Sequence, residues 1–173
     1  MENKKNETEV SDVQEPTTFR EAWDHPDPIQ RKKWREALHK EFRDMINRGV
    51  WRNIKKSQVP KDRRCVKSKW VFKIKRNGVF RARLVACGYS QVPGVDFTEN
   101  YSPVVNDVTF RIMLVAMILW NLDAVLIDVE TAFLHGELEE DIYMECPDGM
   151  ENVNRDEDCL HLRRCIYGLV QSA

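Results

Sequence analysis

The feature that most constrains this 173-residue chain is an alternation of apolar and mostly charged residues over residues 66–86, VKSKWVFKIKRNGVFRARLVA. Successive side chains of a β-strand point to opposite faces, so the alternation predicts two strands. Asn77 and Gly78, at the centre of the stretch, are typical turn residues. The chain is therefore expected to form a hairpin with one apolar face and one charged face.

The apolar pattern also predicts the length of the turn. A two-residue loop at 77–78 would place Ile74 opposite Arg81 and mix apolar with charged residues on one face. A three-residue loop at 76–78 places Ile74 opposite Phe80 instead. The next pairs in that register are Phe72 with Ala82 and Trp70 with Leu84. Because a slip of one residue turns every side chain to the other face, the longer loop is predicted, with Gly78 in the left-handed conformation.

The opposite face of the hairpin is expected to be cationic. It would carry five basic residues and two valines: Lys69, Lys73, Lys75, Arg81, Arg83, Val71 and Val85. A flat ribbon with cations on one face suits the phosphates of a nucleic-acid backbone or a triphosphate. An ordinary solvated sheet face would show the same pattern, and the pattern alone leaves both interpretations open.

Charge is distributed unevenly along the chain. Residues 19–91 hold 21 lysines and arginines against 7 acidic residues, whereas residues 92–173 hold 4 against 16. The formal net charge of −1 hides this asymmetry. A basic block beside an acidic block indicates a polyanion on one side and cations on the other. Chance clustering on a solvated surface is the alternative.

Helical spacing and apolar runs predict the remaining elements. A helix is expected over 28–48, capped by Asp27, with Pro28 at its first position and Gly49 after its end. A second helix is expected over 109–123, capped by Asp107 or Thr109, and apolar nearly all round, so it should be buried on several sides.

Three strands complete the predicted α+β fold. A central strand is expected over 124–129 and short strands over 141–146 and 159–162. The acidic residues of 137–141 are expected to surround a turn. These residues and Glu130 are expected to be solvated charges and not metal ligands. Residues 1–18, which hold 2 basic and 5 acidic residues, are expected to form a disordered polar tail.

No run of 18 apolar residues is present, so no membrane span is expected, and the polar start has no signal-peptide core. The five cysteines include no Cys-x-x-Cys pair, which favours reduced thiols and an intracellular, cytoplasmic or nuclear location. Cys159, His161 and Cys165 are close in sequence, but their spacing matches no zinc pattern.

Five segments in one order carry a resemblance to a known family. They are KSKWVFKIKRNG, RARLVACGYSQVPGVDFTENYSPV, the helix start Thr109-Phe110-Arg111, IDVETAFLHGELEEDIYMECPDGM and LRRCIYGLVQSA. Together they resemble the reverse transcriptase of copia-type LTR retrotransposons, part of a Pol polyprotein, over residues 19–173. The resemblance implies RNA- and DNA-templated DNA synthesis, with magnesium, a template-primer and deoxynucleotides.

The resemblance also explains an otherwise costly carboxylate. Asp128 follows the apolar run Val125-Leu126-Ile127, where an ionised group needs a cationic partner. The resemblance implies that Asp128 binds the catalytic magnesium ions and that the backbone carbonyl of Val129 contributes to the second ion. Without the resemblance, Asp128 would be interpreted as a turn or cap residue.

Further roles follow from the resemblance alone. Phe133 is similar to the aromatic residue beneath the incoming sugar, which excludes a ribose 2′-hydroxyl; its residue pattern alone would suit a core position. Lys73, Lys75, Arg81 and Arg83 lie where the fingers hairpin of the family contacts triphosphate and template.

One departure from the family concerns its second metal motif, a Tyr-x-Asp-Asp turn. No consecutive Asp-Asp occurs in the 173 residues, and the acidic run 156–158 lacks the flanking strands that such a turn needs. The chain is therefore expected to be a partial right-hand polymerase, with fingers at about 19–106 and the start of the palm at about 107–173. Such a fragment is expected to be inactive alone and to self-associate through an exposed palm edge. A non-catalytic nucleic-acid-binding module and an inactive transposon remnant are the alternatives.

Overall fold

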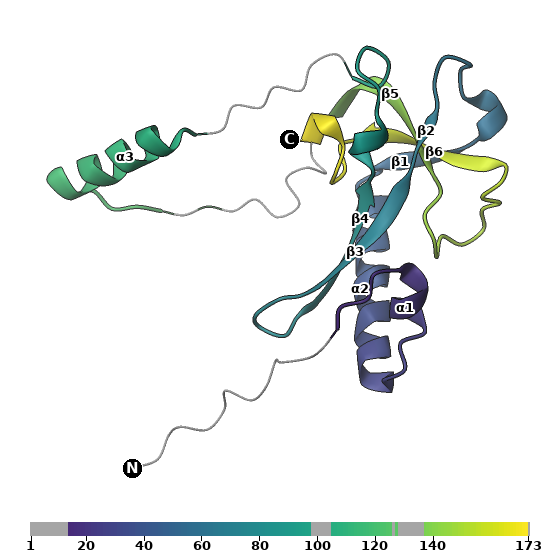
Figure 1. The fold of residues 1–173 in the computed structure, drawn as a ribbon, viewed down its shortest axis with the longest axis horizontal. Coiled ribbons are helices and arrows are strands. Elements are labelled where there is room, and N and C mark those ends of the chain that lie inside the picture. Colours follow the sequence, from purple (N-terminus) through teal and green to yellow (C-terminus); the bar gives the residue numbers. More distant parts are fainter. Residues whose placement is uncertain (1–13, 98–104, 126, 128–136, 173) are drawn as a thin grey trace.

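The structure, a computed structural model, describes residues 14–97, 105–125, 127 and 137–172. It is a mixed α+β fold (Figure 1) with a four-stranded sheet, a separate two-stranded hairpin and α-helices. Short 3-10 turns occur at Lys56–Gln58, Gly88–Ser90 and Val170–Ser172. None of the helices in the described ranges combines the length and apolarity that a membrane crossing requires.

The first long helix, α2, spans Pro28–Asn47, close to its predicted bounds. The carboxylate of Asp27 accepts hydrogen bonds from the backbone N–H groups of Ile29 and Gln30, which confirms the predicted cap. Gly49, with φ +61°, ends the helix in the left-handed conformation. Sequence reasoning missed the preceding helix α1, Phe19–Trp23, because five residues are too short to show helical periodicity.

The hairpin has the predicted register. Strand β3, Ser68–Ile74, pairs antiparallel with β4, Phe80–Ala86, and Ile74 lies opposite Phe80. The backbone N–H of Lys75 donates to the carbonyl of Val79 over 2.9 Å, which leaves residues 76–78 as the loop. Gly78, with φ +75°, adopts the left-handed conformation that the bulged turn requires.

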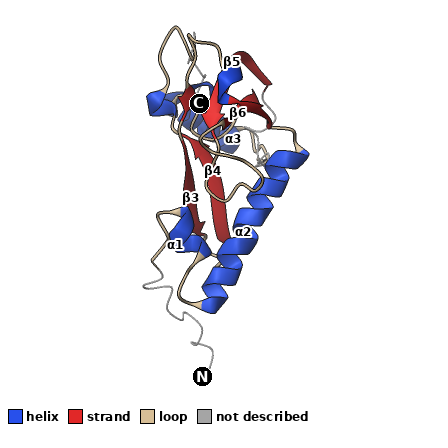
Figure 2. Ribbon diagram, turned by 90° about the vertical axis from the view of Figure 1, so that its right-hand side faces the viewer, coloured by secondary structure: helices blue, strands red, loops and turns tan. Residues whose placement is uncertain are grey.

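The apolar face of the hairpin packs against α2, which runs alongside β3 and β4 (Figure 2). The indole of Trp34 is fully buried, with its ring centroid 5.4 Å from that of Phe72 and 4.5 Å from that of Phe80. Further along the helix, the rings of Phe42 and Trp70 are 5.1 Å apart. Edge-to-face contacts of this kind stabilise beyond their buried area, so they fix the hairpin on the helix.

The four-stranded sheet has the order β1-β6-β5-β2. Its strands are β1 Trp51–Lys55, β2 Cys65–Val66, β5 Glu137–Glu145 and β6 Asp158–Arg164. The predicted strands at 141–146 and 159–162 are present and longer than expected, whereas β1 and β2 were not predicted. The expectation of a turn around residues 137–141 is wrong, because these residues belong to β5, with a register irregularity between Glu137 and Ile142.

The apolar helix α3 spans Asp107–Leu119 and is shorter than the predicted 109–123. Its cap is Asn106, whose side chain accepts from the backbone N–H of Val108, so the prediction of Asp107 or Thr109 was wrong. The expected burial is also wrong: α3 lies apart from the sheet and hairpin (Figure 1), and none of its residues is buried. Ile118 and Leu119 are 81% and 73% exposed.

The described residues of the predicted central strand at 124–129 form no strand. Ala124, Val125 and Ile127 are described and belong to no strand. Leu126, Asp128 and Val129 lie outside the described residues. Without a strand pairing, the side chains of Val125 and Ile127 are 83% and 80% exposed.

Candidate nucleic-acid interface

The cations predicted for one hairpin face do share that face. The face consists of Lys69, Lys73 and Lys75 on β3 or its end, and of Arg81 and Arg83 on β4. Lys73 lies directly opposite Arg81 in the ladder, and Val71 lies opposite Arg83. The three lysines are exposed and the two arginines are half-buried. Because the other face packs on α2, this set, here called the cationic face, is turned away from the hairpin core.

Arg83 is the most constrained cation of the face. Its guanidinium carbon lies 4.7 Å from the ring centroid of Tyr167, a cation–π geometry that holds the side chain in place. Its Nε is buried and has no hydrogen-bond partner among the described residues. A buried donor without a partner is costly.

A carboxylate that sequence reasoning missed lies close to the arginines, sharing a pocket with Arg81. Glu41, on α2, accepts a hydrogen bond from the backbone N–H of Leu84 on β4 over 3.2 Å. Burial raises the pKa of the Glu41 carboxyl above its usual value, while the bond from Leu84 and the charges of Arg83 and Arg81 act in the opposite direction. The signal was present in the sequence, because Glu41 falls on the same helical stripe as Trp34, Leu38 and Met45.

A second carboxylate contacts the face at the outer edge of β3. The Nζ of Lys73 lies 3.3 Å from Glu15 Oε2, and the backbone N–H of Ile74 donates to Glu15 Oε1 over 2.8 Å. The hydrogen bond from Ile74, followed by the contacts with Lys73, lowers the pKa of Glu15. One of the five predicted cations is therefore already ion-paired within the chain.

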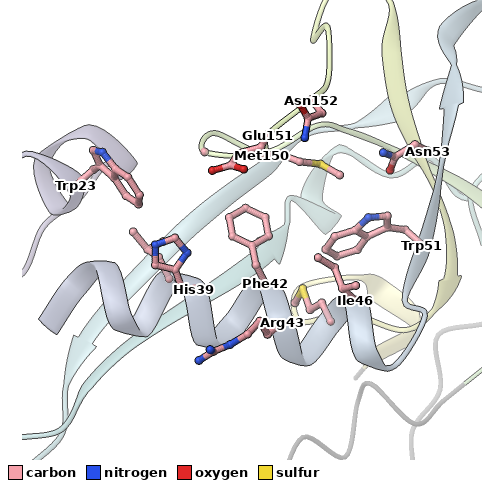
Figure 3. Close-up of a pocket in the computed structure, with 13 residues that line it drawn as sticks. Trp23, His39, Phe42, Arg43, Ile46, Trp51, Asn53, Met150, Glu151 and Asn152 are labelled. Carbon is pink, nitrogen blue, oxygen red and sulfur yellow. The ribbon is translucent and has the colours of Figure 1, made fainter. Parts of the chain in front are cut away.

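A groove of about 700 Å³ lies between α1, α2, β1 and the loop 149–152 (Figure 3). Its aromatic lining comes from Trp23, Phe42 and Trp51, with Met150 and Glu151 above Phe42. No hairpin residue lines this groove. Phe42 contacts Trp70 on the apolar face of the hairpin, so the groove and the cationic face are separated by the thickness of the ribbon. They are not parts of one site.

The residues to which the resemblance assigns chemical roles, Asp128, Val129 and Phe133, lie outside the described residues, as does Glu130. Among the residues that are described, no three His, Cys, Asp or Glu side chains gather as a metal site. The magnesium assignment therefore remains a prediction.

The surroundings of Cys159 and Cys165 favour protonated thiols. Burial, followed by the neighbouring Cys65, raises the pKa of the Cys159 thiol to about 12, and burial also raises the pKa of Cys165. Both thiols are protonated at neutral pH, whereas metal ligation and nucleophilic attack need the thiolate. His161, between them in sequence, accepts from Arg52 Nε over 3.1 Å and bonds Asp141 Oδ1 over 2.8 Å.

Comparisons with known proteins identify one family. The family described as reverse transcriptase (RNA-dependent DNA polymerase) matches residues 49–173. The chain is 38% identical, over 94% of its length, to the retrovirus-related Pol polyprotein from transposon TNT 1-94 of Nicotiana tabacum. It is 34% identical, over 81% of its length, to the Pol polyprotein from transposon RE2 of Arabidopsis thaliana.

More distant similarity reaches yeast, where the truncated transposon Ty1-A Gag-Pol polyprotein of Saccharomyces cerevisiae is 28% identical over 83% of the chain. The chain spans 12% of the length of the tobacco polyprotein and 10% of the RE2 polyprotein. No solved structure matches the chain significantly.

Substitution of Glu41 by Gln tests the electrostatics near the cationic face. Because the folded-state pKa is raised, Glu41 contributes most to stability when protonated, and that contribution is lost as the pH rises from the unfolded pKa through the folded one. Glu41→Gln should keep the bond from Leu84 and stabilise the chain at pH 7 by up to about 1 kcal/mol. Urea unfolding between pH 4 and pH 7 measures the difference, which should vanish at the acidic end.

The matched control is Glu36→Gln, an exposed position on the same helix, which should change stability by less than about 0.5 kcal/mol at either pH. A Glu41→Gln protein that is less stable at pH 7 would show that attraction by the arginines outweighs the cost of burial.

Proposed function

This chain belongs to the reverse transcriptase (RNA-dependent DNA polymerase) family, and we propose that the cationic face of its hairpin binds the phosphates of a template-primer or an incoming deoxynucleotide. The observation that carries the proposal is the separation of the two hairpin faces. The apolar face packs on α2 and stabilises the fold, whereas the cations lie on the opposite face of the ladder. Lys75 and Arg81 also line a pocket that they share with Glu41 of α2. Phosphate contacts from such a face would be insensitive to base sequence.

The order of the Arg83 side chain also supports the proposal. Tyr167 holds the guanidinium, whose carbon lies 4.7 Å from the ring centroid. A preordered planar cation is suited to a phosphate, because little side-chain entropy is lost when the phosphate binds.

The catalytic part of the proposal rests on the family. We propose a fingers segment at about 19–106 and the start of a palm at about 107–173, with Asp128 and the Val129 carbonyl as magnesium ligands. Both groups are hard oxygen donors, which magnesium prefers. Bound metal ions would stabilise the charge on the attacking and leaving oxygens of nucleotidyl transfer. Phe133 would exclude the 2′-hydroxyl of a ribonucleotide by its bulk. The free thiols of the chain support an intracellular location.

Nucleic-acid binding is expected to be weak, strongly salt-dependent and nearly independent of sequence. If about three phosphates are neutralised, the slope of log K against log salt should be near −2 for single strands. The four-fold variant Lys73→Ser, Lys75→Ser, Arg81→Ser and Arg83→Ser should weaken binding and flatten this slope. Fluorescence anisotropy with a labelled oligonucleotide measures both quantities.

The matched control replaces Lys32 and Lys61, two exposed lysines outside the hairpin, by Ser. A Lys75→Ser, Arg81→Ser pair removes the same charge from the cationic face without disturbing the contacts of Arg83. If the hairpin pair and the control pair lower affinity equally, net charge and not the cationic face accounts for binding.

DNA synthesis by the 173 residues alone is not expected. The second carboxylate motif of the family needs consecutive aspartates, and the sequence contains none. With primer, template, magnesium and deoxynucleotides, the purified chain should extend no primer above a no-enzyme control. Extension that disappears in Asp128→Ala would contradict this expectation and would show that Asp128 suffices as the aspartate ligand.

The binding measurement also separates both binding functions from an inactive remnant. A non-catalytic binding module retains hairpin-dependent affinity without extension, as the polymerase fragment does. An inactive remnant shows neither hairpin-dependent affinity nor a cooperative unfolding transition.

Self-association is proposed from the exposed apolar surface of α3. The chain was expected to associate through a strand edge beside Val125, Leu126 and Ile127, but the described apolar surface is concentrated on the helix. Apolar patches larger than a few hundred Å² are unusual for a soluble monomer. An Ile118→Lys, Leu119→Lys variant should therefore sediment closer to the monomer mass than the parent chain. Ile29→Lys, at an exposed position of α2, is the control and should leave the sedimentation unchanged.

A further inference from the structure

The segment before α1 is anchored against the hairpin and its surroundings. Pro16 is buried, and the hydroxyl of Thr18 accepts from the backbone N–H of Glu21 as the cap of α1. At the next residue, the ring of Phe19 stacks on Trp23 at 5.4 Å and lies 6.4 Å from Trp70 of β3. These contacts, at Pro16 and at the residues after it, hold the segment so that the Glu15 carboxylate reaches the edge of the hairpin.

Glu15 uses two donors that are available to an anion from solution. In the ladder with β4, residues of β3 alternately donate toward the partner strand and away from it. Lys75 donates to Val79 on the inner side, so the N–H of Ile74 points to the open edge, where it meets Glu15 Oε1. The ammonium of Lys73 completes the site from the cationic face. One N–H and one ammonium around two carboxylate oxygens is also an arrangement that suits two oxygens of a phosphate.

We propose that Glu15 is an intrachain competitor for phosphate at Lys73 and the Ile74 N–H, so that the N-terminal segment lowers the affinity of the cationic face for nucleic acid. The proposal rests on the proposed function, because it assumes that the face binds phosphate. A tethered carboxylate acts at an effective concentration in the millimolar range, against which a dilute nucleic acid must compete. The Lys73 side chain is 69% exposed, so the ion pair is weak enough to be displaced.

The same contact has a second physical consequence that must be separated from competition. A carboxylate on an outward N–H also covers an unpaired strand edge and protects it from association. Glu15→Gln distinguishes the two effects. Its amide oxygen can still accept from Ile74, so edge protection is retained, whereas the charge that competes with phosphate is removed.

Oligonucleotide binding by the 173-residue chain and its Glu15→Gln variant tests the proposal. The variant should bind a single strand about two- to five-fold more tightly at low salt. One additional phosphate contact should steepen the slope of log K against log salt by about 0.7. The control is Glu21→Gln, which removes an equal charge from the same part of the chain. The Glu21 carboxylate accepts hydrogen bonds from the N–H and hydroxyl of Thr17 and, within the described residues, does not contact the hairpin cations. This control should change affinity less and leave the slope unaltered.

A double-mutant cycle with Lys73→Gln separates this inference from the function on which it rests. The gain from Glu15→Gln should disappear when Lys73 is Gln. If Glu15→Gln gives no gain in affinity, or gives an equal gain with and without Lys73, the competition is overturned. The proposed function still stands in that case, provided that the Lys75→Ser, Arg81→Ser pair weakens binding. If that pair also leaves binding unchanged, the proposed function fails and the competition fails with it.

Discussion

The packing of the hairpin's apolar face against α2 is the interaction on which the rest of the described structure depends. Trp34 contacts Phe72 and Phe80 from one turn of the helix, and Phe42 contacts Trp70 further along. An isolated two-stranded hairpin is marginal in water, so the helix supplies the stability that the ribbon lacks. The same contact decides which face of the ribbon is turned outward, and thereby presents the cations.

Two carboxylates, Glu41 and Glu15, change the electrostatic potential at the cationic face. Glu41 lies within the helix–hairpin contact, where burial raises its pKa and where it satisfies the backbone of β4. Glu15 lies at the outer edge of β3, where hydrogen bonds lower its pKa and keep it ionised. Glu41 therefore contributes less negative charge at mildly acidic pH, whereas Glu15 retains its negative charge there. The arginines of β4 and Lys73 of β3 consequently experience different electrostatic surroundings, although they share one face.

The four-stranded sheet joins parts of the chain on both sides of α3. Strands β1 and β2 come before the hairpin and β5 and β6 come after the helix, yet β1 pairs with β6 and β2 with β5. This pairing ties the 51–66 segment to the 137–164 segment. The helix α3 takes no part in it and leaves apolar side chains exposed. A sequence that is apolar around a helix indicates that it can be covered on several sides, but which surface covers it depends on partners that the described residues do not supply.

The structural features that the sequence determined by itself depend on residues close together along the chain. The alternation over 66–86 was sufficient to predict the register, the three-residue loop and the glycine conformation of the hairpin, because only one register keeps Trp70, Phe72 and Ile74 on one face. The cap and bounds of α2 and the family membership were equally readable. Tertiary structure decided the rest: the exposed α3, the strands β1 and β2, and the partners Glu15 and Glu41. Short edge strands and long-range ion pairs have no periodicity along the chain, because they arise only when segments distant in sequence come together.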